Sequence, residues 1–118
     1  MAVTVKVLID SKIAESTQTT QYVASGVTTI IDKMTATNYS TTAATISVNL
    51  VALAGAAGSG NLIVKTKTLQ ASETYTFPEL VGHVLNPGGL ISTLAGTASA
   101  INIRVSGRVV RSEERRVG

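Results

Sequence analysis

The residue types that most often carry acid–base or metal chemistry are few in this sequence and stand apart. His83 is the only histidine, and Glu79 is the carboxylate nearest to it along the chain. A metal site needs several ligands of this kind, and acid–base catalysis needs a second group placed beside the first. One glutamate and one histidine meet neither requirement. The sequence therefore predicts a protein that is not an enzyme and that holds no metal or cofactor.

The remaining candidates for chemistry lead to the same expectation. Asp10, Glu15, Asp32 and Glu73 share no spacing that suggests paired carboxylates, and there is no cysteine to serve as a nucleophile or metal ligand. The glycine-rich stretch "GAAGSGN" lacks the Lys-Ser or Lys-Thr of a phosphate-binding loop, and a strand pattern follows it. We interpret this stretch as the loop of a β-hairpin.

Apolar and polar residues alternate along much of the chain, as expected for strands that bury one face. Thr, Val and Ile together make up about a third of the residues, and their branched side chains favour pleated sheets. A shift of one residue would expose a whole apolar set, so the alternation also predicts which side chains are buried. These are Ile46, Val48, Leu50, Leu62, Val64, Ile101, Ile103 and Val105.

The spacing of strands and turns predicts the fold class. Turn-forming residues separate the strand patterns, and "NPGG" at residues 86–89 suits a type II turn. We expect an all-β fold over residues 1–110, a single β-sandwich of about seven or eight antiparallel strands, either immunoglobulin-like or jelly-roll. Asp32 shares a face with Ile30 and Met34, which predicts that this strand lies at an edge or contains a bulge.

The predicted strand at the start of the chain, "MAVTVKVLI", is the best candidate for contact with another protein. It carries few charges, and its residues Val3, Val5 and Val7 alternate with polar ones. A sandwich leaves sheet edges open, and such a strand suits pairing with a neighbouring subunit. We expect a homo-oligomer or a lattice component, in which removing residues 1–9 weakens assembly more than it disturbs the sandwich.

Other partners are less well supported by the composition. The net charge is +3 at pH 7, and there is no dense basic patch with interleaved aromatics, so we expect no nucleic-acid binding. No stretch approaches the roughly 20 apolar residues of a membrane span, so we expect no membrane partner. A ligand-binding module that recognises glycans or a host surface is the alternative, with Tyr39, on a predicted turn, as its candidate residue.

Several stretches of this chain resemble a class of small proteins encoded by tailed bacteriophages. They are "TATNYSTTAATISVNLVA", "NLIVKTKTL", "SETYTFPELVGHVL" and the closing strand "INIRVSG", within roughly residues 20–108. Proteins of this class are accessory components of the virion. The resemblance implies a structural protein made in the cytoplasm of a bacterial host and located in the virion. There it would decorate or cement the capsid, or sit at the neck or fibres, and the resemblance transfers no active-site residue.

The last eight residues, "RSEERRVG" at 111–118, differ sharply from the rest in composition. They resemble the translation of a sequencing adapter, codon for codon, which implies a metagenomic assembly artefact. We therefore interpret residues 111–118 as a non-native or disordered tail and expect its deletion to change neither folding nor assembly.

Overall fold

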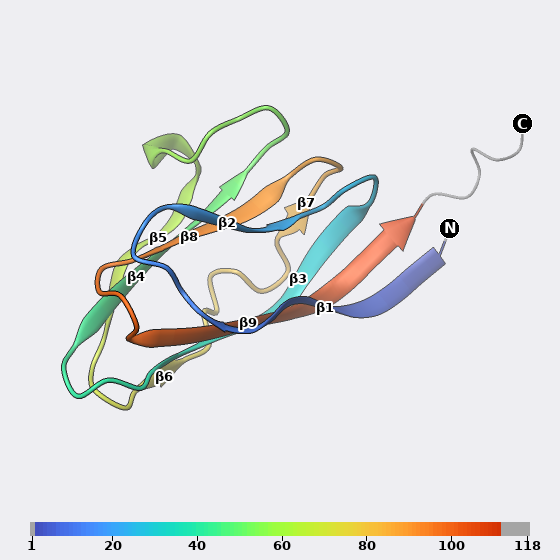
Figure 1. Ribbon diagram of the computed structural model, residues 1–118. Coiled ribbons are helices and arrows are strands. Elements are labelled where there is room, and N and C mark those ends of the chain that lie inside the picture. The colour runs from blue at the N-terminus through green and yellow to red at the C-terminus, as the bar shows by residue number, and fades with distance from the viewer. Residues whose placement is uncertain (1, 112–118) are drawn as a thin grey trace, which may run out of the picture.

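A computed structural model describes residues 2–111, which form two β-sheets packed face to face (Figure 1). The short 3₁₀ helix η1 (Ser59–Asn61) is the only helix in this range, so the predicted all-β sandwich is confirmed. The strands are β1 (Ala2–Ile13), β2 (Thr19–Val23), β3 (Thr28–Asn38), β4 (Ala44–Val51), β5 (Leu62–Leu69), β6 (Thr74–Tyr75), β7 (Val84–Leu85), β8 (Leu90–Ala95) and β9 (Ile101–Arg111).

The strand order is that of one long hairpin wound on itself. β4 pairs with β5 at its tip; outward from there β3 pairs with β6 and β7, β2 with β8, and β1 with β9, always antiparallel. The result is a four-stranded sheet, β2-β8-β4-β5, and a five-stranded sheet, β1-β9-β3-β6 with β7 also on β3. This is a jelly-roll order. In an immunoglobulin fold the first two strands share a sheet, whereas β1 and β2 here do not.

The structure has nine strands within residues 2–111, where the sequence predicts seven or eight. β7 has only two residues, which is too short to show a pattern. Arg111, the first residue of the predicted tail, is the last residue of β9 and lies opposite Ala2. The rest of the predicted tail, residues 112–118, lies outside the described residues, so the expectations for it stay predictions.

The core lies between the sheets and follows the predicted alternation with two exceptions. Leu50 and Leu62 are only half-buried, because both lie at the loop end of the β4–β5 hairpin, where the sandwich is less well covered. The other predicted core residues are buried, namely Ile46, Val48, Val64, Ile101, Ile103 and Val105.

The segment between β6 and β7 fills the space beside β3 with the largest core side chain. Phe77 is fully buried, and the ring of Tyr75 packs edge-on against it at 4.8 Å. Successive turns follow, in which the Leu80 N–H donates to the Phe77 carbonyl and the His83 N–H to the Leu80 carbonyl. Leu80 is also buried, so this segment closes one side of the core.

Register shifts change the alternation along the five-stranded sheet, twice in β1 and once in β3. The register of β1 against β9 shifts between Val7 and Ile9, and Leu8 and Ile9 are consequently both buried. The register of β3 against β9 shifts between Ile31 and Lys33, which places a bulge at Asp32 as one of the two predicted alternatives. The other alternative, an edge strand, is wrong, because β3 lies between β9 and the pair β6 and β7.

The predicted turn at residues 86–89 is confirmed. The Gly89 N–H donates to the Asn86 carbonyl at 2.8 Å, and Gly88 has φ +90°. A positive φ at the third position defines a type II turn and favours glycine there. The turn leads from β7 of one sheet into β8 of the other.

Candidate interaction surface

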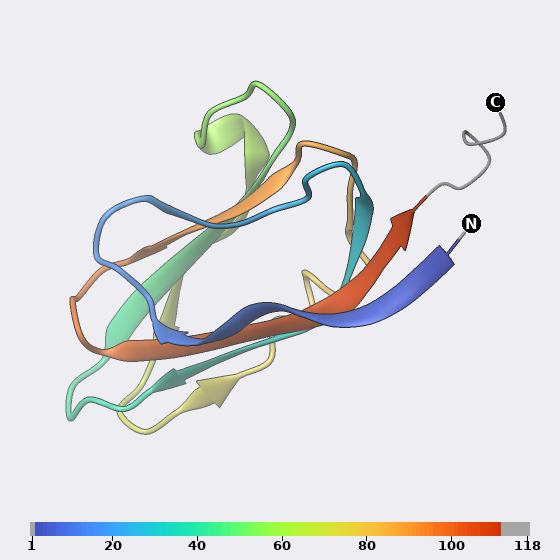
Figure 2. The same ribbon diagram turned by 45° about the vertical axis from the view of Figure 1, so that its right-hand side comes forward.

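The first half of β1 forms a free edge of the five-stranded sheet. Residues 2–7 pair with β9 on one side, and within residues 2–111 no strand pairs with their other side. Figures 1 and 2 both show this segment at the rim of the sheet with β9 beside it. Alternate N–H and C=O groups of such an edge point outward. The segment therefore offers backbone hydrogen bonds to a further strand.

The three valines of this edge project from the outer face of the sheet. Val3 lies opposite Val110 and Val5 opposite Arg108, residues that alternate with the buried ones of β9. The exposed fractions of Val3, Val5 and Val7 are 57%, 80% and 41%. The β1 bulge is the cause, because it places the valines on the face opposite to that of the buried residue that follows. The predicted contact positions are thus exposed and lie together on one edge.

An exposed apolar surface extends from these valines across the neighbouring strands. Arg108 in β9 lies directly opposite both Val5 and Ile30, and Ile30 lies opposite Val84 in β7. Val84 is 52% exposed. The face therefore carries exposed or partly exposed apolar residues on four strands, with Arg108 and Ser106 of β9 among them. We call the following residues the outer patch: Val3, Val5, Val7, Ile30, Val84 and Val110.

A single ion pair lies within the outer patch. The Arg108 Nη2 atom is 2.8 Å from Oδ1 of Asp32, and its Nε atom is 3.1 Å from both carboxylate oxygens. The hydrogen bond to Asp32 raises the pKa of Arg108 above its ordinary value. Both side chains are about 40% exposed, so the pair contributes little to stability. Its effect is to offset the charge of Arg108 beside the apolar residues of this face, which also carries Lys33 opposite Ser106.

Sequence reasoning identified part of this surface and missed the rest. Val3, Val5 and Val7 were expected as contact residues, whereas Ile30, Val84 and Val110 were not. Each of these three sits next to a buried residue in its strand, a signal that the sequence already contains. The alternation does not show which strands are neighbours, so it could not join the residues into one surface.

The outer face of the four-stranded sheet has the opposite character. Asn49 and Ser92 point outward there, yet they are buried under other polar groups. The Gln18 Nε2 atom donates to the Ser92 hydroxyl at 2.7 Å, and Asn49 Nδ2 donates to Asn61 Oδ1 at 2.7 Å and to the Gly58 carbonyl at 3.0 Å. This network holds the loop before β5 against the four-stranded sheet, and the loop covers that part of the sheet. The exposed apolar residues that extend over several neighbouring strands are on the five-stranded sheet.

The other sheet edges in the described part of the chain carry features that discourage strand pairing. β2 has a register shift between Thr20 and Tyr22. β5 is irregular against β4, with φ +44° at Thr66 and an exposed Lys65 beside it. β6 and β7 have two residues each. Short, bulged or charged edges are common protections against unwanted pairing. Residues 2–7 of β1 lack a bulge and carry one charge, at Lys6.

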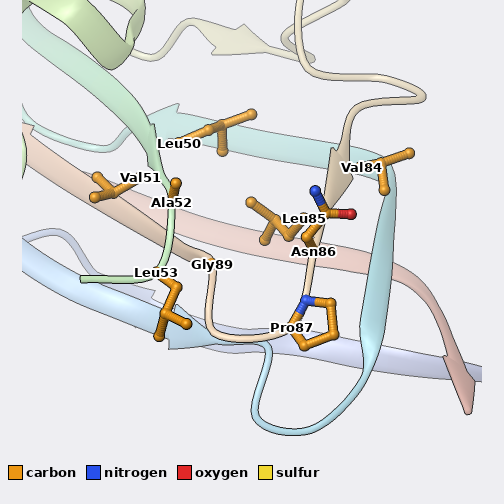
Figure 3. A pocket seen from close by; sticks show the side chains of 9 residues that line it. All are labelled: Leu50, Val51, Ala52, Leu53, Val84, Leu85, Asn86, Pro87 and Gly89. Atoms are coloured by element: carbon orange, nitrogen blue, oxygen red, sulfur yellow. The ribbon is translucent and has the colours of Figure 1, made fainter. Parts of the chain in front are cut away.

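A hollow of about 360 Å³ lies where the end of β4 approaches β7 and the turn that follows it (Figure 3). Ligand sites usually combine an apolar lining with several convergent polar groups. Here Asn86 supplies the only polar side chain of the lining. The hollow therefore defines no class of ligand and contains no catalytic group. Its other lining residues are Leu50, Val51, Ala52, Leu53, Val84, Leu85, Pro87 and Gly89.

Tyr39, the candidate for ligand recognition, is half-exposed on the turn after β3. The other tyrosines lie elsewhere. The Tyr22 hydroxyl lies 2.8 Å from the Thr29 hydroxyl inside the sandwich, and Tyr75 packs on the core. The structure therefore brings no second tyrosine to Tyr39 among the residues it describes.

Glu79 and His83 do not form an acid–base pair. Both carboxylate oxygens of Glu79 accept from the Tyr75 hydroxyl, at 2.6 and 2.7 Å. This hydrogen bond raises the pKa of Tyr75 to about 12 and lowers that of Glu79. The backbone carbonyl of His83 accepts a hydrogen bond from the Ile31 N–H. The Glu79 carboxylate therefore makes a structural contact with Tyr75.

The described residues include no group of three His, Cys, Asp or Glu side chains that would hold a metal ion. No helix among them is long and apolar enough to cross a membrane. No protein-family model matches the sequence, and no curated protein matches it at a significant level. Over residues 2–111 the fold is therefore an all-β sandwich with a jelly-roll strand order, whose five-stranded sheet carries the outer patch and a regular free edge at residues 2–7.

Proposed function

We propose that this chain is a non-enzymatic structural protein of a bacteriophage particle, which decorates or cements the capsid or sits at the neck or fibres. It would be made in the bacterial cytoplasm and bind other virion proteins through the outer patch. The observation that carries the proposal is the outer patch itself. It spans four strands, and two of the charged side chains on the same face, Arg108 and Asp32, form an ion pair with each other.

An apolar surface of this kind favours binding to a protein over binding to a small ligand. Contiguous apolar patches on soluble proteins commonly mark contacts with other proteins. Much of the opposite outer face is covered by a polar network and the loop before β5, which leaves the outer patch as the broader apolar surface. Jelly rolls form viral capsid proteins as well as lectins, which supports the proposal by analogy of fold alone. The resemblance of the sequence stretches to phage accessory proteins favours the virion.

The direct experiment is mass spectrometry of purified particles of the phage whose genome encodes this chain. We expect its peptides in the particles at a constant ratio to the major capsid protein. A protein abundant in the infected cell and missing from purified particles would overturn the proposal. Binding on a glycan array that is lost with Tyr39→Ala would favour the ligand-binding alternative instead.

A matched pair of variants tests the outer patch. Val84→Lys places a charge on the outer patch, whereas Val23→Lys places one on the four-stranded sheet. The two valines are similarly exposed, Val84 at 52% and Val23 at 46%. We expect Val84→Lys to lower the copies per particle at least about tenfold and Val23→Lys to have little effect, since a buried unpaired charge is strongly unfavourable at an interface. Equal incorporation of both variants would contradict a role for the patch.

A further inference from the structure

We propose that the free edge of β1 pairs antiparallel with the same edge of a second copy, with Val5 opposite Val5. The two five-stranded sheets would then join into one continuous sheet across a twofold axis. This inference rests on the structural role proposed above and names the partner of the edge. The outer patch would bind the particle, and the edge would bind another copy.

The symmetry of the pairing limits its register. A twofold axis perpendicular to the sheet keeps the outer face of both copies on the same side. Each residue must then face a partner residue with the same orientation, so valines face valines. With Val5 on the axis, Val3 faces Val7 of the second copy, and Thr4 faces Lys6. All three valines of each copy are matched.

The bulge and the charge of β1 select this register among the symmetric ones. Residues 2–7 are free of register shifts, and the first shift follows Val7. Centring the pair on Val5 uses this regular segment almost completely. Centring it on Lys6 would place two like charges directly opposite each other, which is destabilising. Centring it on Thr4 would leave Val7 without a valine partner.

The joined sheets extend the apolar face. Val5 of the two copies would lie side by side, so the two outer patches would meet at the axis and form one larger surface. A dimer would therefore bind a particle through two patches at once, which strengthens attachment without any new type of contact.

The size of the edge sets the expected strength of the dimer. Stable interfaces bury about 800 Å² per partner, and a segment of six residues offers less than this. We therefore expect a weak dimer, with a dissociation constant on the order of 100 µM in solution. The chain would be mostly monomeric when dilute and would dimerise at the high local concentration of a particle surface.

Cysteine cross-linking reads out the register, because the natural chain contains no cysteine. Facing residues in a sheet have Cβ atoms about 4.5–5.5 Å apart, close enough for a disulfide after small adjustments. In the full chain at high concentration, we expect Val5→Cys to form at least about ten times more disulfide dimer than Thr4→Cys. The two Thr4 positions would lie diagonally, about 7–8 Å apart.

A mixture of two variants gives the sharper test. Val3→Cys and Val7→Cys chains should form a mixed disulfide more readily than either forms a disulfide with itself, since these residues face each other only in the proposed register. Val23→Cys, an exposed valine on the edge strand β2, controls for random collisions. Circular dichroism of each reduced variant checks that the fold is intact.

Two results would overturn the inference. One is disulfide formation by Val5→Cys no faster than by Val23→Cys. The other is a full-length chain that sedimentation shows to be strictly monomeric up to about 1 mM, tenfold above the expected constant. Neither result would affect the detection of the protein in particles, so failure of the edge pairing and failure of the proposed function are distinguishable.

Discussion

Asn38 anchors the turn that carries Tyr39. Its side chain is fully buried, and its Nδ2 atom donates to the carbonyls of Thr42 and Leu69 at 2.8 and 2.9 Å. Its Oδ1 atom accepts from the backbone N–H and the hydroxyl of Ser40. One side chain therefore satisfies both ends of a turn that joins the two sheets.

We expect Asn38→Ala to lower the free energy of unfolding by about 2–4 kcal/mol. The substitution leaves the buried carbonyl of Leu69 without this donor and the turn without its anchor. Chemical denaturation measures the effect. Thr41→Ala, at an exposed position of the same turn, is the control and should change stability by less than about 0.5 kcal/mol. Similar losses for both variants would show that the turn tolerates loss of the anchor.

The pair of Tyr75 and Glu79 gives a prediction about pH. Glu79 raises the pKa of Tyr75 to about 12, so the folded protein holds this proton more tightly than the unfolded chain, whose phenol has its ordinary pKa near 10. The stability from this hydrogen bond is fully present between the ordinary pKa of Glu79, about 4.5, and about pH 10. It is lost as the pH rises through about 12, and also as the pH falls through the lowered pKa of Glu79.

Tyr75 can be titrated alone in a variant that carries Tyr22→Phe and Tyr39→Phe. Ultraviolet absorbance should then show phenol ionisation near pH 12, and adding Glu79→Gln should move it back toward 10, because the carboxylate is the largest cause of the shift. An unchanged titration after Glu79→Gln would mean that the hydrogen bond is not formed in solution.

At the level of the strands, the sequence predicts the long, regular elements well. The clearest case is β9, in which buried residues alternate with more exposed ones along most of the strand. β4 and β5 also exist as their apolar patterns predict, although Asn49 on the outer face of β4 is buried and β5 is irregular. β7 did not follow, since it is held by its contact with β3 and not by any pattern of its own. The same holds for the outer patch, whose members come together only through the pairing of β1, β9, β3 and β7.

The bulge at Leu8 explains why the alternation in β1 does not predict correctly which of its residues are buried. Alternation places Val3, Val5, Val7 and Ile9 on one face, whereas the register shift turns Ile9 into the core and leaves the valines outside. Removal of residues 1–9 would therefore also remove part of the core. Leu8 and Ile9 belong to the core, so only residues before Leu8 can be removed to test assembly without loss of core packing.

Gly107 lies where β9 and β3 approach each other closely in the five-stranded sheet. It lies in β9 between Lys6 and Ile31, and a Cβ atom there would collide with the backbone oxygen of Ile30. A strand cannot move its backbone away without breaking pairing on both sides. We expect Gly107→Ala to lower the free energy of unfolding by about 1–3 kcal/mol, as overpacking does.

Thermal or chemical unfolding of Gly107→Ala checks this prediction. Ser106→Ala, on the outer face of the same strand, is the matched control and should be nearly neutral. A Gly107→Ala variant as stable as the natural chain would show that the β3–β9 pair can separate locally at low cost.

Across the whole molecule, protection is uneven. One outer face is covered by a polar network and one is apolar, and the edge formed by residues 2–7 is the regular one. We expect hydrogen exchange to reflect this difference in the dilute protein. Backbone amides of β4 and β8, inside the four-stranded sheet, should exchange at least about a hundredfold more slowly than the amides of residues 2–7, which have a partner strand on one side only.

Mass spectrometry or NMR of the dilute protein measures these exchange rates. Repeating the experiment at high concentration separates the fold from the proposed pairing. Slower exchange confined to residues 2–7 would support pairing there, and no change in that segment would count against it. Uniform exchange over all strands would contradict the uneven protection itself.

The nested pairing of the strands also sets an order in time. β4 and β5 are neighbours along the chain, whereas β1 and β9 meet only by closing a loop of almost the whole domain. Pairings between distant segments form late, and β1 is synthesised well before β9. Until β9 has been synthesised, β1 therefore has no partner strand on either side. We therefore expect β1 to be the strand most readily swapped between newly made copies. Translation of many copies close together would then favour domain-swapped dimers.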